Sequence, residues 1–442
     1  MERPQDALRA NPFTYGNPIS DPERFIGRRR EVDQVFSRLR NAEAESSSLV
    51  GERRVGKTSL LAYLAHPDVR RRYGLDPDRY LFIYADLEMV DKTTTPARLA
   101  QRLLRQLARQ CPDAEVKQLA EQMRQSENID NFALADLFDT VDQKNLHVVF
   151  LLDEFENVTS NANFGPDFFY GLRSLAIQHN LSLVTSSRRE LIELCHSEAI
   201  RSSPFFNIFA NINVRLFSED EARQLISAAV APTGVRFTDV EIETLFRIAG
   251  LHPFFLQAAC HFLFESYANG LGPDERSKFL QQEYREEATP HLSDYWHNSD
   301  DHEKIVLTAL ALLEPQAKQS KTRFSRDELH NLYSHSDQTL SRLEKRCLLA
   351  SRNDTFALFN AALGEWIVGE ITNVLDDQPT YADWLKSNQG SMERLSTRAR
   401  SELGEILPKI SGKYRDLIIT WASDPRNLLT VAGLLRGVVG LG

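Results

Sequence analysis

One eight-residue stretch has the composition and spacing of a phosphate-binding loop. Residues 51–58 read Gly-Glu-Arg-Arg-Val-Gly-Lys-Thr and match the pattern G-x-x-x-x-G-K-[ST]. Gly51 and Gly56 permit a tight turn whose backbone N–H groups converge on phosphate oxygens. Lys57 would reach the β- and γ-phosphates, and the Thr58 hydroxyl would bind Mg²⁺. The residues expected to contact the nucleotide in this loop are Gly51, Arg54, Val55, Gly56, Lys57, Thr58 and Ser59.

The segments on either side of the loop support this interpretation. Residues 46–50 can form a short buried strand, and residues 58–65 have the composition of a helix. A helix that starts near Lys57 would direct the positive end of its dipole at the same phosphates. A glycine turn without a ligand is the alternative, and this context disfavours it.

A second motif carries two carboxylates at the end of an apolar run. Residues 147–154 read His-Val-Val-Phe-Leu-Leu-Asp-Glu, which is typical of a central parallel strand buried on both faces. Asp153 is expected to hold Mg²⁺ opposite Thr58. Glu154 is expected to act as the general base that polarises the attacking water. Alternatively, the two carboxylates would only cap the helix that follows.

Further motifs resemble one family, the STAND NTPases and the related archaeal-type ATPases of the AAA+ group. Residues 25–31, Phe-Ile-Gly-Arg-Arg-Arg-Glu, are similar to the h-h-G-R-x-x-E entry segment of that family, and residues 11–18 to the arm that precedes it. The resemblance implies that Phe25 and Ile26 contact the adenine base. It covers roughly residues 11–370.

Two later segments resemble the nucleotide-sensing parts of the same family. Residues 181–189 are similar to the sensor-1 strand, which implies that Ser186 and Arg188 face the γ-phosphate, with Arg189 as the alternative register. Residues 249–257, which include Gly250-Leu-His-Pro253, resemble the G-x-P segment in the helical lid of that family, and the resemblance implies that Pro253 lies near the nucleotide. The neighbouring His252 is interpreted as a packed histidine. The expected catalytic residues are Glu154, Lys57, Ser186 and Arg188.

The resemblance has gaps. The M-H-D tripeptide with which the NB-ARC branch contacts ADP is missing from the sequence. An arginine finger cannot be assigned either, and Arg201 is only a weak candidate for that role.

The order of the expected elements indicates an α/β fold with a parallel sheet covered by helices on both faces. Together with the phosphate loop, the resemblance implies a P-loop NTPase of the ASCE/AAA+ type. A helical lid, a winged-helix domain and a small α-helical C-terminal region are expected to follow it. The expected strands lie near residues 46–50, 80–87, 146–152, 182–186 and 212–216. The expected domains are an N-terminal arm (1–24), the NTPase domain (25–217), the lid (218–300), the winged helix (301–372) and the C-terminal region (373–442).

Local signals place the later boundaries. Ser218-Glu-Asp-Glu221 is a capping box that starts the lid, and Ser325-Arg-Asp-Glu328 is a second one inside the winged-helix pattern. Residues 337–347 would form the third helix of that domain, and residues 348–359 a two-stranded wing.

Charge weighs against DNA as the main partner of the winged helix. Residues 303–372 contain nine Lys and Arg and nine Asp and Glu. A DNA-binding domain usually has a basic surplus, so a protein contact is favoured. Arg342, Lys345 and Arg346 nevertheless cluster on the expected third helix and leave DNA binding open.

Composition agrees with a reduced, water-soluble protein. The chain has 442 residues, 42% of them hydrophobic and 26% charged, with a net charge of −10. Its four cysteines, Cys111, Cys195, Cys260 and Cys347, are scattered and are expected to be buried thiols. The polar N-terminus has no apolar signal region, and a cytoplasmic location is expected. The apolar residues 428–442 would dock on a partner, on a membrane surface or on the protein itself.

The function expected from these features is that of an ATP-dependent switch. ADP would hold the closed state, whereas ATP with Mg²⁺ would favour an open state that forms a homo-oligomer. The resemblance implies slow hydrolysis and a role in bacterial signalling or antiphage defence, with a sensor or effector protein in trans. One alternative is a DNA-associated AAA+ ATPase of the initiator or transposition-helper type. The other is a scaffold that binds nucleotide without hydrolysing it.

Overall fold

The computed structural model describes residues 10–41, 43–127, 129–320, 323–333 and 335–375. The chain divides into two compact units. One is Gly16–Phe217, and the other combines the residues up to Tyr15 with those from Ser218 onward. The predicted arm is therefore shared between the units. The predicted C-terminal helices after residue 375 and the apolar segment 428–442 lie outside the described residues.

The Gly16–Phe217 unit is built on a five-stranded parallel sheet with the order β2-β3-β4-β1-β5. Strand β4 lies between β1, which leads into the phosphate loop, and β3, which ends in the carboxylates. The strands are β1 (Ser46–Val50), β2 (Tyr80–Asp86), β3 (His147–Asp153), β4 (Leu181–Ser187) and β5 (Phe209–Asn213). Since all five run in one direction, their carboxyl ends meet at one edge. The predicted α/β fold class is confirmed.

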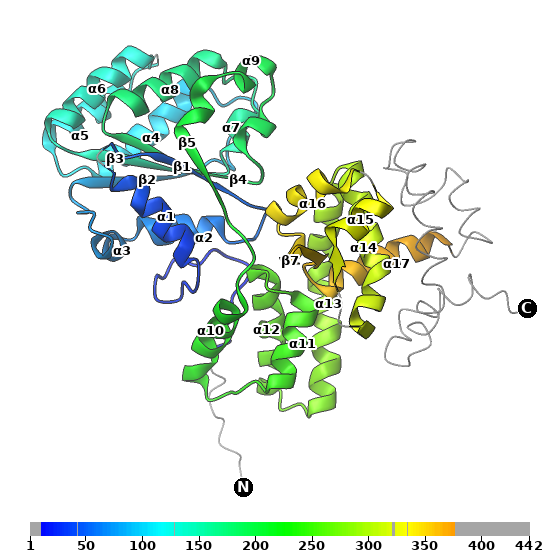
Figure 1. Cartoon of the computed structure of the whole chain (residues 1–442). Helices are drawn as coiled ribbons and strands as arrows, with labels where there is room; N and C mark the ends of the chain where they lie inside the picture. Colours follow the sequence, from blue (N-terminus) through cyan, green and yellow to red (C-terminus); the bar gives the residue numbers. More distant parts are fainter. Residues whose placement is uncertain (1–9, 42, 128, 321–322, 334, 376–442) are drawn as a thin grey trace, which may run out of the picture. The chain divides into compact units, whose positions relative to one another are not determined.

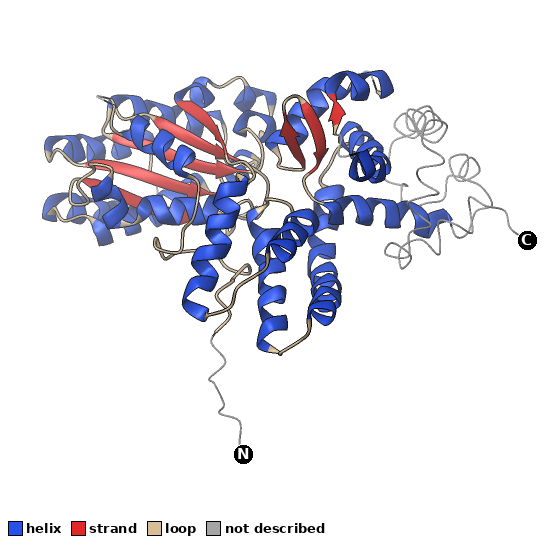
Figure 2. Ribbon diagram, turned by 60° about the horizontal axis from the view of Figure 1, so that its bottom comes forward, coloured by secondary structure: helices blue, strands red, loops and turns tan. Residues whose placement is uncertain are grey.

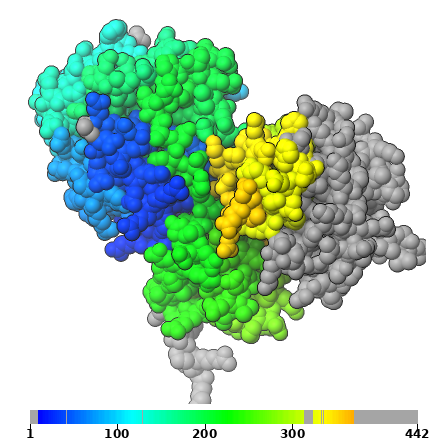
Figure 3. Space-filling model, viewed as in Figure 1, coloured from blue at the N-terminus to red at the C-terminus, as the bar shows by residue number. Residues whose placement is uncertain are grey.

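Helices cover both faces of this sheet (Figures 1 and 2). Alternate residues of β2 and β3, such as Ile83 and Phe150, belong to a buried cluster with α4, α6 and α8. Helices α1 and α2 pack on the other face. In Figure 3 the cyan to green helices form the outer surface of this unit on one side and the blue segments on the other. The helices are α1 (Arg29–Leu39), α2 (Lys57–Ala65), α3 (Pro67–Arg72), α4 (Pro96–Gln110), α5 (Ala114–Met123), α6 (Asn131–Gln143), α7 (Glu156–Thr159), α8 (Pro166–Gln178) and α9 (Glu198–Arg201), with the short 3₁₀ helices Leu191–Leu194 and Pro204–Ile208.

Helix α4 shows how sequence determines one of these elements. Its buried residues include Leu99, Leu103 and Leu107, which recur every four positions and form one apolar face. The Thr95 side chain caps the first turn by accepting a hydrogen bond from the backbone N–H of Arg98. Proline at the first helical position needs no N–H partner there, so Pro96 fits the start.

The prediction for the last strand is wrong by three residues. Residues 212–216 were expected, whereas β5 is Phe209–Asn213. Its register pairs Ser46 with Phe209 and Val50 with Asn213, and Val214 N–H donates the last bond to the Val50 carbonyl. The alternating sequence pattern continues to residue 216, whereas the pairing of β5 with β1 ends with Val50 and Asn213. Strand β5 is also an edge strand, so its burial pattern is weak.

The second unit is helical up to residue 320 and then carries a three-stranded antiparallel sheet of order β6-β8-β7. Both predicted capping boxes, at Ser218 and Ser325, are confirmed. The turn between β7 and β8 places Asn353 and Asp354 at positive φ, as a tight hairpin requires. The elements are α10 (Glu219–Val230), the 3₁₀ helix Ala231–Thr233, α11 (Asp239–Ala249), α12 (Pro253–Ala268), α13 (Pro273–His297), α14 (Asp301–Ser320), β6 (Phe324–Ser325), α15 (Arg326–Leu332), α16 (Ser336–Lys345), β7 (Leu349–Arg352), β8 (Thr355–Leu358) and α17 (Ala361–Leu375). The winged-helix assignment of the elements from α14 onward stays a prediction.

The N-terminal arm residues up to Tyr15 pack on α12 within the second unit. Phe13 is buried and stacks on Phe237 with a centroid distance of 6.0 Å. The Asn11 side chain donates to the backbone carbonyl of His261, and the Phe13 carbonyl lies 3.0 Å from His261 Nδ1. Tyr15 contacts the rings of Phe254 and His261 edge-on.

All four cysteines are buried thiols, as predicted. None of the helices described by the structure combines the length and the apolar character needed to cross a membrane.

A tight contact joins the turn between α11 and α12 to the residue that follows β8 in the second unit. Gly250, between α11 and α12, has φ 65° and ψ −161°, a region that is essentially restricted to glycine. A Cβ atom at this position would lie 2.0 Å from the Phe359 carbonyl oxygen. Glycine is therefore required both by the backbone conformation and by the close approach.

We predict that Gly250→Ala lowers the free energy of unfolding by about 2 kcal/mol or more, because it adds a clash to backbone strain. Gly270→Ala is the matched control, since Gly270 has φ 68° with nothing within 4 Å of the added methyl group. Its cost should be about 1 kcal/mol, from strain alone. Urea-unfolding midpoints would measure both, and equal shifts would contradict the role of the Phe359 contact.

Candidate nucleotide-binding site

The phosphate loop joins β1 to α2 and has the backbone geometry that its glycines suggested. Gly56 caps α2 with φ 101°, and Arg54 also has positive φ, at 64°. Gly51 is needed for space, because a Cβ atom there would lie 2.9 Å from the Val214 carbonyl oxygen of the neighbouring strand end. The Gly51 N–H donates to the Ser187 carbonyl at 3.1 Å, which anchors the start of the loop.

Lys57 places its charge inside the loop. The side chain is almost fully buried, and Nζ donates to the backbone carbonyls of Gly51 at 2.9 Å and Glu52 at 3.2 Å. Nζ also lies 3.9 Å from Glu154 Oε1. The two predicted catalytic residues Lys57 and Glu154 are therefore brought together across the loop.

The carboxylate of Asp153 is fixed by donors from both neighbouring strands. Oδ2 accepts a hydrogen bond from the Tyr84 hydroxyl of β2 at 3.1 Å, and Oδ1 accepts one from the Ser186 hydroxyl of β4. Asp153 is only 2% exposed. Because each oxygen keeps a second lone pair, the carboxylate can still bind a cation.

The backbone at Glu154 turns sharply after β3. Glu154 has φ 53°, which is uncommon for a residue with a side chain, and its N–H donates to the Ser186 hydroxyl at 3.1 Å. Ser186 thus contacts both residues of the acidic pair. The predicted sensor residue Ser186 and the acidic strand end therefore form one hydrogen-bonded group.

Arg188 is the predicted sensor arginine, and in this structure it pairs with a carboxylate. Its backbone N–H and its Nε both donate to Glu156 Oε1, each at 3.2 Å. Glu156 is 4% exposed, and its Oε2 has no hydrogen-bond partner. The structure therefore places Arg188 beside the acidic strand end, while its contact with the γ-phosphate stays a prediction.

Burial raises the pKa of Glu154 to about 7, against the opposing effect of the Lys57 ammonium. The neighbouring carboxylates of Glu156 and Asp153 add to the rise. A general base works best when its pKa is close to the operating pH. Glu154 therefore has the acid–base property that its predicted role requires.

The predicted Mg²⁺ ligands offer suitable atoms. Thr58 is half-buried on the first turn of α2, and Asp153 stands at the end of β3. A hydroxyl and a carboxylate are hard oxygen donors, which Mg²⁺ prefers. The residues therefore fit the metal, which would supply charge neutralisation to bound phosphates.

The remaining predicted nucleotide contacts lie in different parts of the structure. Phe25 stacks on Tyr63 of α2 with centroids 4.4 Å apart, and Ile26 is half-buried beside it in sequence. The Ser59 hydroxyl accepts a hydrogen bond from the Ile19 N–H, so the arm reaches the helix of the phosphate loop. Pro253 is buried at the first position of α12 in the second unit, and its contact with nucleotide stays a prediction.

His252 is a packed histidine, as interpreted from the sequence. It is fully buried between Tyr295, Phe255 and Phe359.

Three residues of the site had no predicted role, namely Arg28, Tyr84 and Glu156. Arg28 is 3% exposed and has φ 65°. Its Nη2 donates to the Val55 carbonyl of the phosphate loop at 2.8 Å, and its Nη1 donates to the Arg215 carbonyl. For Arg28, the sequence offers only its place in the entry segment as a signal. For Tyr84, the signal is a tyrosine near the end of an apolar strand.

The strand order, the phosphate loop and the paired carboxylates define a P-loop NTPase. The model of the family Novel STAND NTPase 2 matches residues 40–311, which is more than half of the chain. The chain therefore belongs to the Novel STAND NTPase 2 family, and the STAND resemblance inferred from the sequence is confirmed.

Solved structures of low sequence identity share the fold. The Walker-type ATPase of Pyrococcus abyssi is 14% identical, with a TM-score of 0.51, and the match covers 80% of this chain and 98% of that one. The ORC2 protein of Aeropyrum pernix, solved as ADPNP–ADP complexes, is 14% identical, with a TM-score of 0.53 and coverage of 81% and 96%. No curated protein sequence matches this chain. These structures support the fold alone.

We predict that hydrolysis at saturating nucleotide falls about ten-fold per pH unit below about pH 7, because protonated Glu154 cannot accept a proton from water. Above that pH the rate should level off. Glu154→Gln should lower the rate by at least about a hundred-fold and remove this limb of the profile. A wild-type rate that is flat from acidic to neutral pH would contradict Glu154 as the base.

We predict that Tyr84→Phe lowers kcat about ten-fold, because a hydrogen bond to a charged group contributes about 1.5 kcal/mol to fixing Asp153. Tyr80→Phe is the matched control at the opposite end of the same strand. Steady-state rates of both variants would be compared with wild type. Equal rates for Tyr84→Phe and wild type would show that Asp153 needs no such support.

Proposed function

We propose that this chain is a Mg²⁺-dependent ATPase that uses slow hydrolysis to time a conformational switch. ATP or ADP would bind the phosphate loop, with Lys57 on the β- and γ-phosphates and Thr58 and Asp153 on the metal. The observation that carries the proposal is the contact between Lys57 and Glu154 at 3.9 Å beside the fixed Asp153 carboxylate. This arrangement supports the proposal because the residues proposed as phosphate ligand, base and metal ligand lie close together at one edge of the sheet.

The switch itself would act through the hydrogen-bonded groups around the γ-phosphate position. A γ-phosphate carries negative charge and would compete with Glu154 for Lys57 and with Glu156 for Arg188. ADP lacks this group, so the two nucleotides would favour different arrangements of these side chains. A ligand shifts an equilibrium only by its differential affinity for the two states, and these contacts supply such a difference.

The lid helices and the C-terminal sheet would respond as one body. Both belong to the unit that starts again at Ser218, and Gly250 packs directly on Phe359. ADP would hold this unit in a closed state, and ATP would favour an open state that forms a homo-oligomer. A partner protein would then act as sensor or effector, in bacterial signalling or antiphage defence.

The basic cluster of the expected third helix gives little support to the alternative of a DNA-associated ATPase. Arg346 is buried, and its Nη1 donates to Glu303 Oε2 at 2.5 Å and to Ser299 Oγ at 3.0 Å. Arg342 pairs with Asp300 at 2.9 Å. Two of the three basic residues thus neutralise carboxylates of their own unit, and a DNA reader needs free positive charge.

We predict that the solution mass rises with a non-hydrolysable ATP analogue and Mg²⁺ but not with ADP. Light scattering on the full chain would measure it. Lys57→Ala should abolish the rise because it removes the charge aimed at phosphate. Arg53→Ala, in the exposed part of the same loop, is the matched control and should keep it.

A mass that is the same with ADP and the analogue would contradict the assembly step. The same samples with duplex DNA would then test the alternative, since DNA-stimulated hydrolysis and salt-sensitive binding would favour a DNA-associated ATPase.

A further inference from the structure

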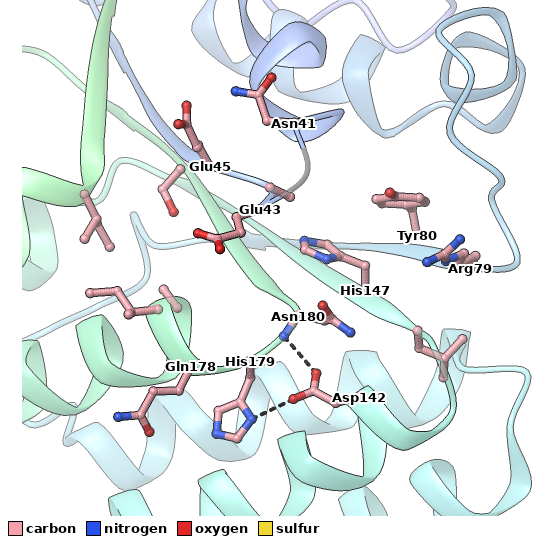
Figure 4. A pocket seen from close by; sticks show the side chains of 16 residues that line it. Asn41, Glu43, Glu45, Arg79, Tyr80, Asp142, His147, Gln178, His179 and Asn180 are labelled. Atoms are coloured by element: carbon pink, nitrogen blue, oxygen red, sulfur yellow. Dashed lines mark hydrogen bonds and ion pairs between the residues drawn. The ribbon is translucent and has the colours of Figure 1, made fainter.

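The edge of the sheet opposite the phosphate loop contains a polar cavity of about 470 Å³. Because the strands are parallel, their first residues meet here, and Ser46, Tyr80 and His147 line the cavity from β1, β2 and β3 (Figure 4). Asp142 from the end of α6 and His179 from the end of α8 complete one side. Neither the ATPase chemistry nor the proposed switch uses any of these residues.

Asp142 and His179 also belong to a three-residue cluster with Asp139. Asp139 and Asp142 are three residues apart on α6 and therefore share one face of the helix. His179 follows the last residue of α8. One ligand atom from each side chain lies within 4.8 Å of the other two, and in the described part of the chain this is the single such group of three His, Cys, Asp or Glu residues.

The three side chains converge on one point. His179 Nδ1 and Asp142 Oδ2 share a hydrogen bond of 2.8 Å, and Asp139 Oδ1 lies 3.6 Å from the same nitrogen, so a cation bound here would replace the shared proton. Asp142 is held in place because its other oxygen, Oδ1, accepts the Asn180 N–H at 2.8 Å. The His179 side chain is only 7% exposed, so two of the three groups are already oriented.

The local charge is that of a cation site. A structural ion pair with His179 needs only one carboxylate, but two carboxylates converge on the same ring nitrogen. The cavity adds the acidic side chain of Glu43. Arg79 keeps its positive charge, because its hydrogen bonds of 2.7 and 3.1 Å go to neutral Asn145, but one guanidinium balances only one of the three carboxylates. The cluster therefore has excess negative charge beside a space large enough for water and a small ligand.

We propose that Asp139, Asp142 and His179 bind a divalent transition-metal ion, for which Zn²⁺ is the best match. One imidazole nitrogen and two carboxylate oxygens are ligands that Zn²⁺ accepts, while the nitrogen donor disfavours Mg²⁺. Three protein ligands leave a fourth position of a tetrahedral site for water or for a ligand in the cavity. The metal would crosslink α6 to the end of α8, at the edge of the sheet remote from the nucleotide.

In the experiment, the full chain is titrated with ZnCl₂ in the absence of nucleotide, and binding is measured by isothermal titration calorimetry. Wild type should bind one Zn²⁺ at this site, and affinity should fall as the pH is lowered, because protons compete with the metal for Nδ1. Asp139→Asn and His179→Gln should each weaken binding at least about ten-fold. Asp136→Asn is the matched control, since Asp136 is an exposed carboxylate of the same helix outside the cluster, and it should bind as wild type does.

Asp139→Asn is the decisive variant. Its side chain is 62% exposed, so the substitution leaves the fold intact even if His179→Gln does not. Absence of Zn²⁺ binding in wild type, or unchanged affinity in Asp139→Asn, would overturn the proposal. The outcome is independent of the proposed switch, because neither the phosphate loop nor nucleotide takes part in the measurement.

Discussion

The buried positive charge of Lys57 is the constraint around which the carboxyl edge of the sheet is organised. A buried ammonium is costly unless its charge is compensated and its protons are bonded. Here two carbonyls of its own loop bind it, and Glu154 lies 3.9 Å away. Burial raises the pKa of Glu154 to about 7, so this carboxyl group is only partly ionised near neutral pH. Phosphate oxygens would therefore compete for Lys57 with two neutral carbonyls and a partly ionised carboxyl group.

The surrounding hydrogen bonds hold Asp153 and the phosphate loop in one arrangement. Tyr84 and Ser186 reach Asp153 from the two strands that flank β3, and Arg28 binds the Val55 carbonyl on the far side of the loop. Because Arg28 also reaches the Arg215 carbonyl and covers the Phe217 ring at 4.7 Å, it connects the entry segment to the end of the Gly16–Phe217 unit. The loop is therefore held by the first and the last parts of its own unit.

The sequence predicts the elements of this site better than the contacts among their side chains. Gly51, Gly56 and Asp153 follow from it because a phosphate loop and a buried acidic strand have local signatures. Tyr84 cannot be predicted in this way, because its contact with Asp153 depends on the register between two strands that are distant in sequence. That register pairs Tyr84 with Leu151 and Asp86 with Asp153. Glu156 was missed for the same reason, since Arg188 comes to it from β4. Strand β5 was displaced by three residues because an edge strand ends where its neighbour ends, which an apolar pattern alone does not show.

The division of the chain limits how nucleotide state can reach the second unit. The backbone passes between the units after Tyr15 and again after Phe217. Residues near both connections contact the surroundings of the phosphate loop. Near the first, the Ile19 N–H donates to the Ser59 hydroxyl. At the second, the Phe217 ring packs against Arg28, which donates to the Val55 carbonyl of the loop. On the other side, Tyr15 packs on α12, and α12 follows the Gly250 contact with Phe359. The backbone thus connects the surroundings of the phosphate loop at two places to a unit in which α11 and α12 are already packed against the end of the C-terminal sheet, so the proposed switch would move these elements together.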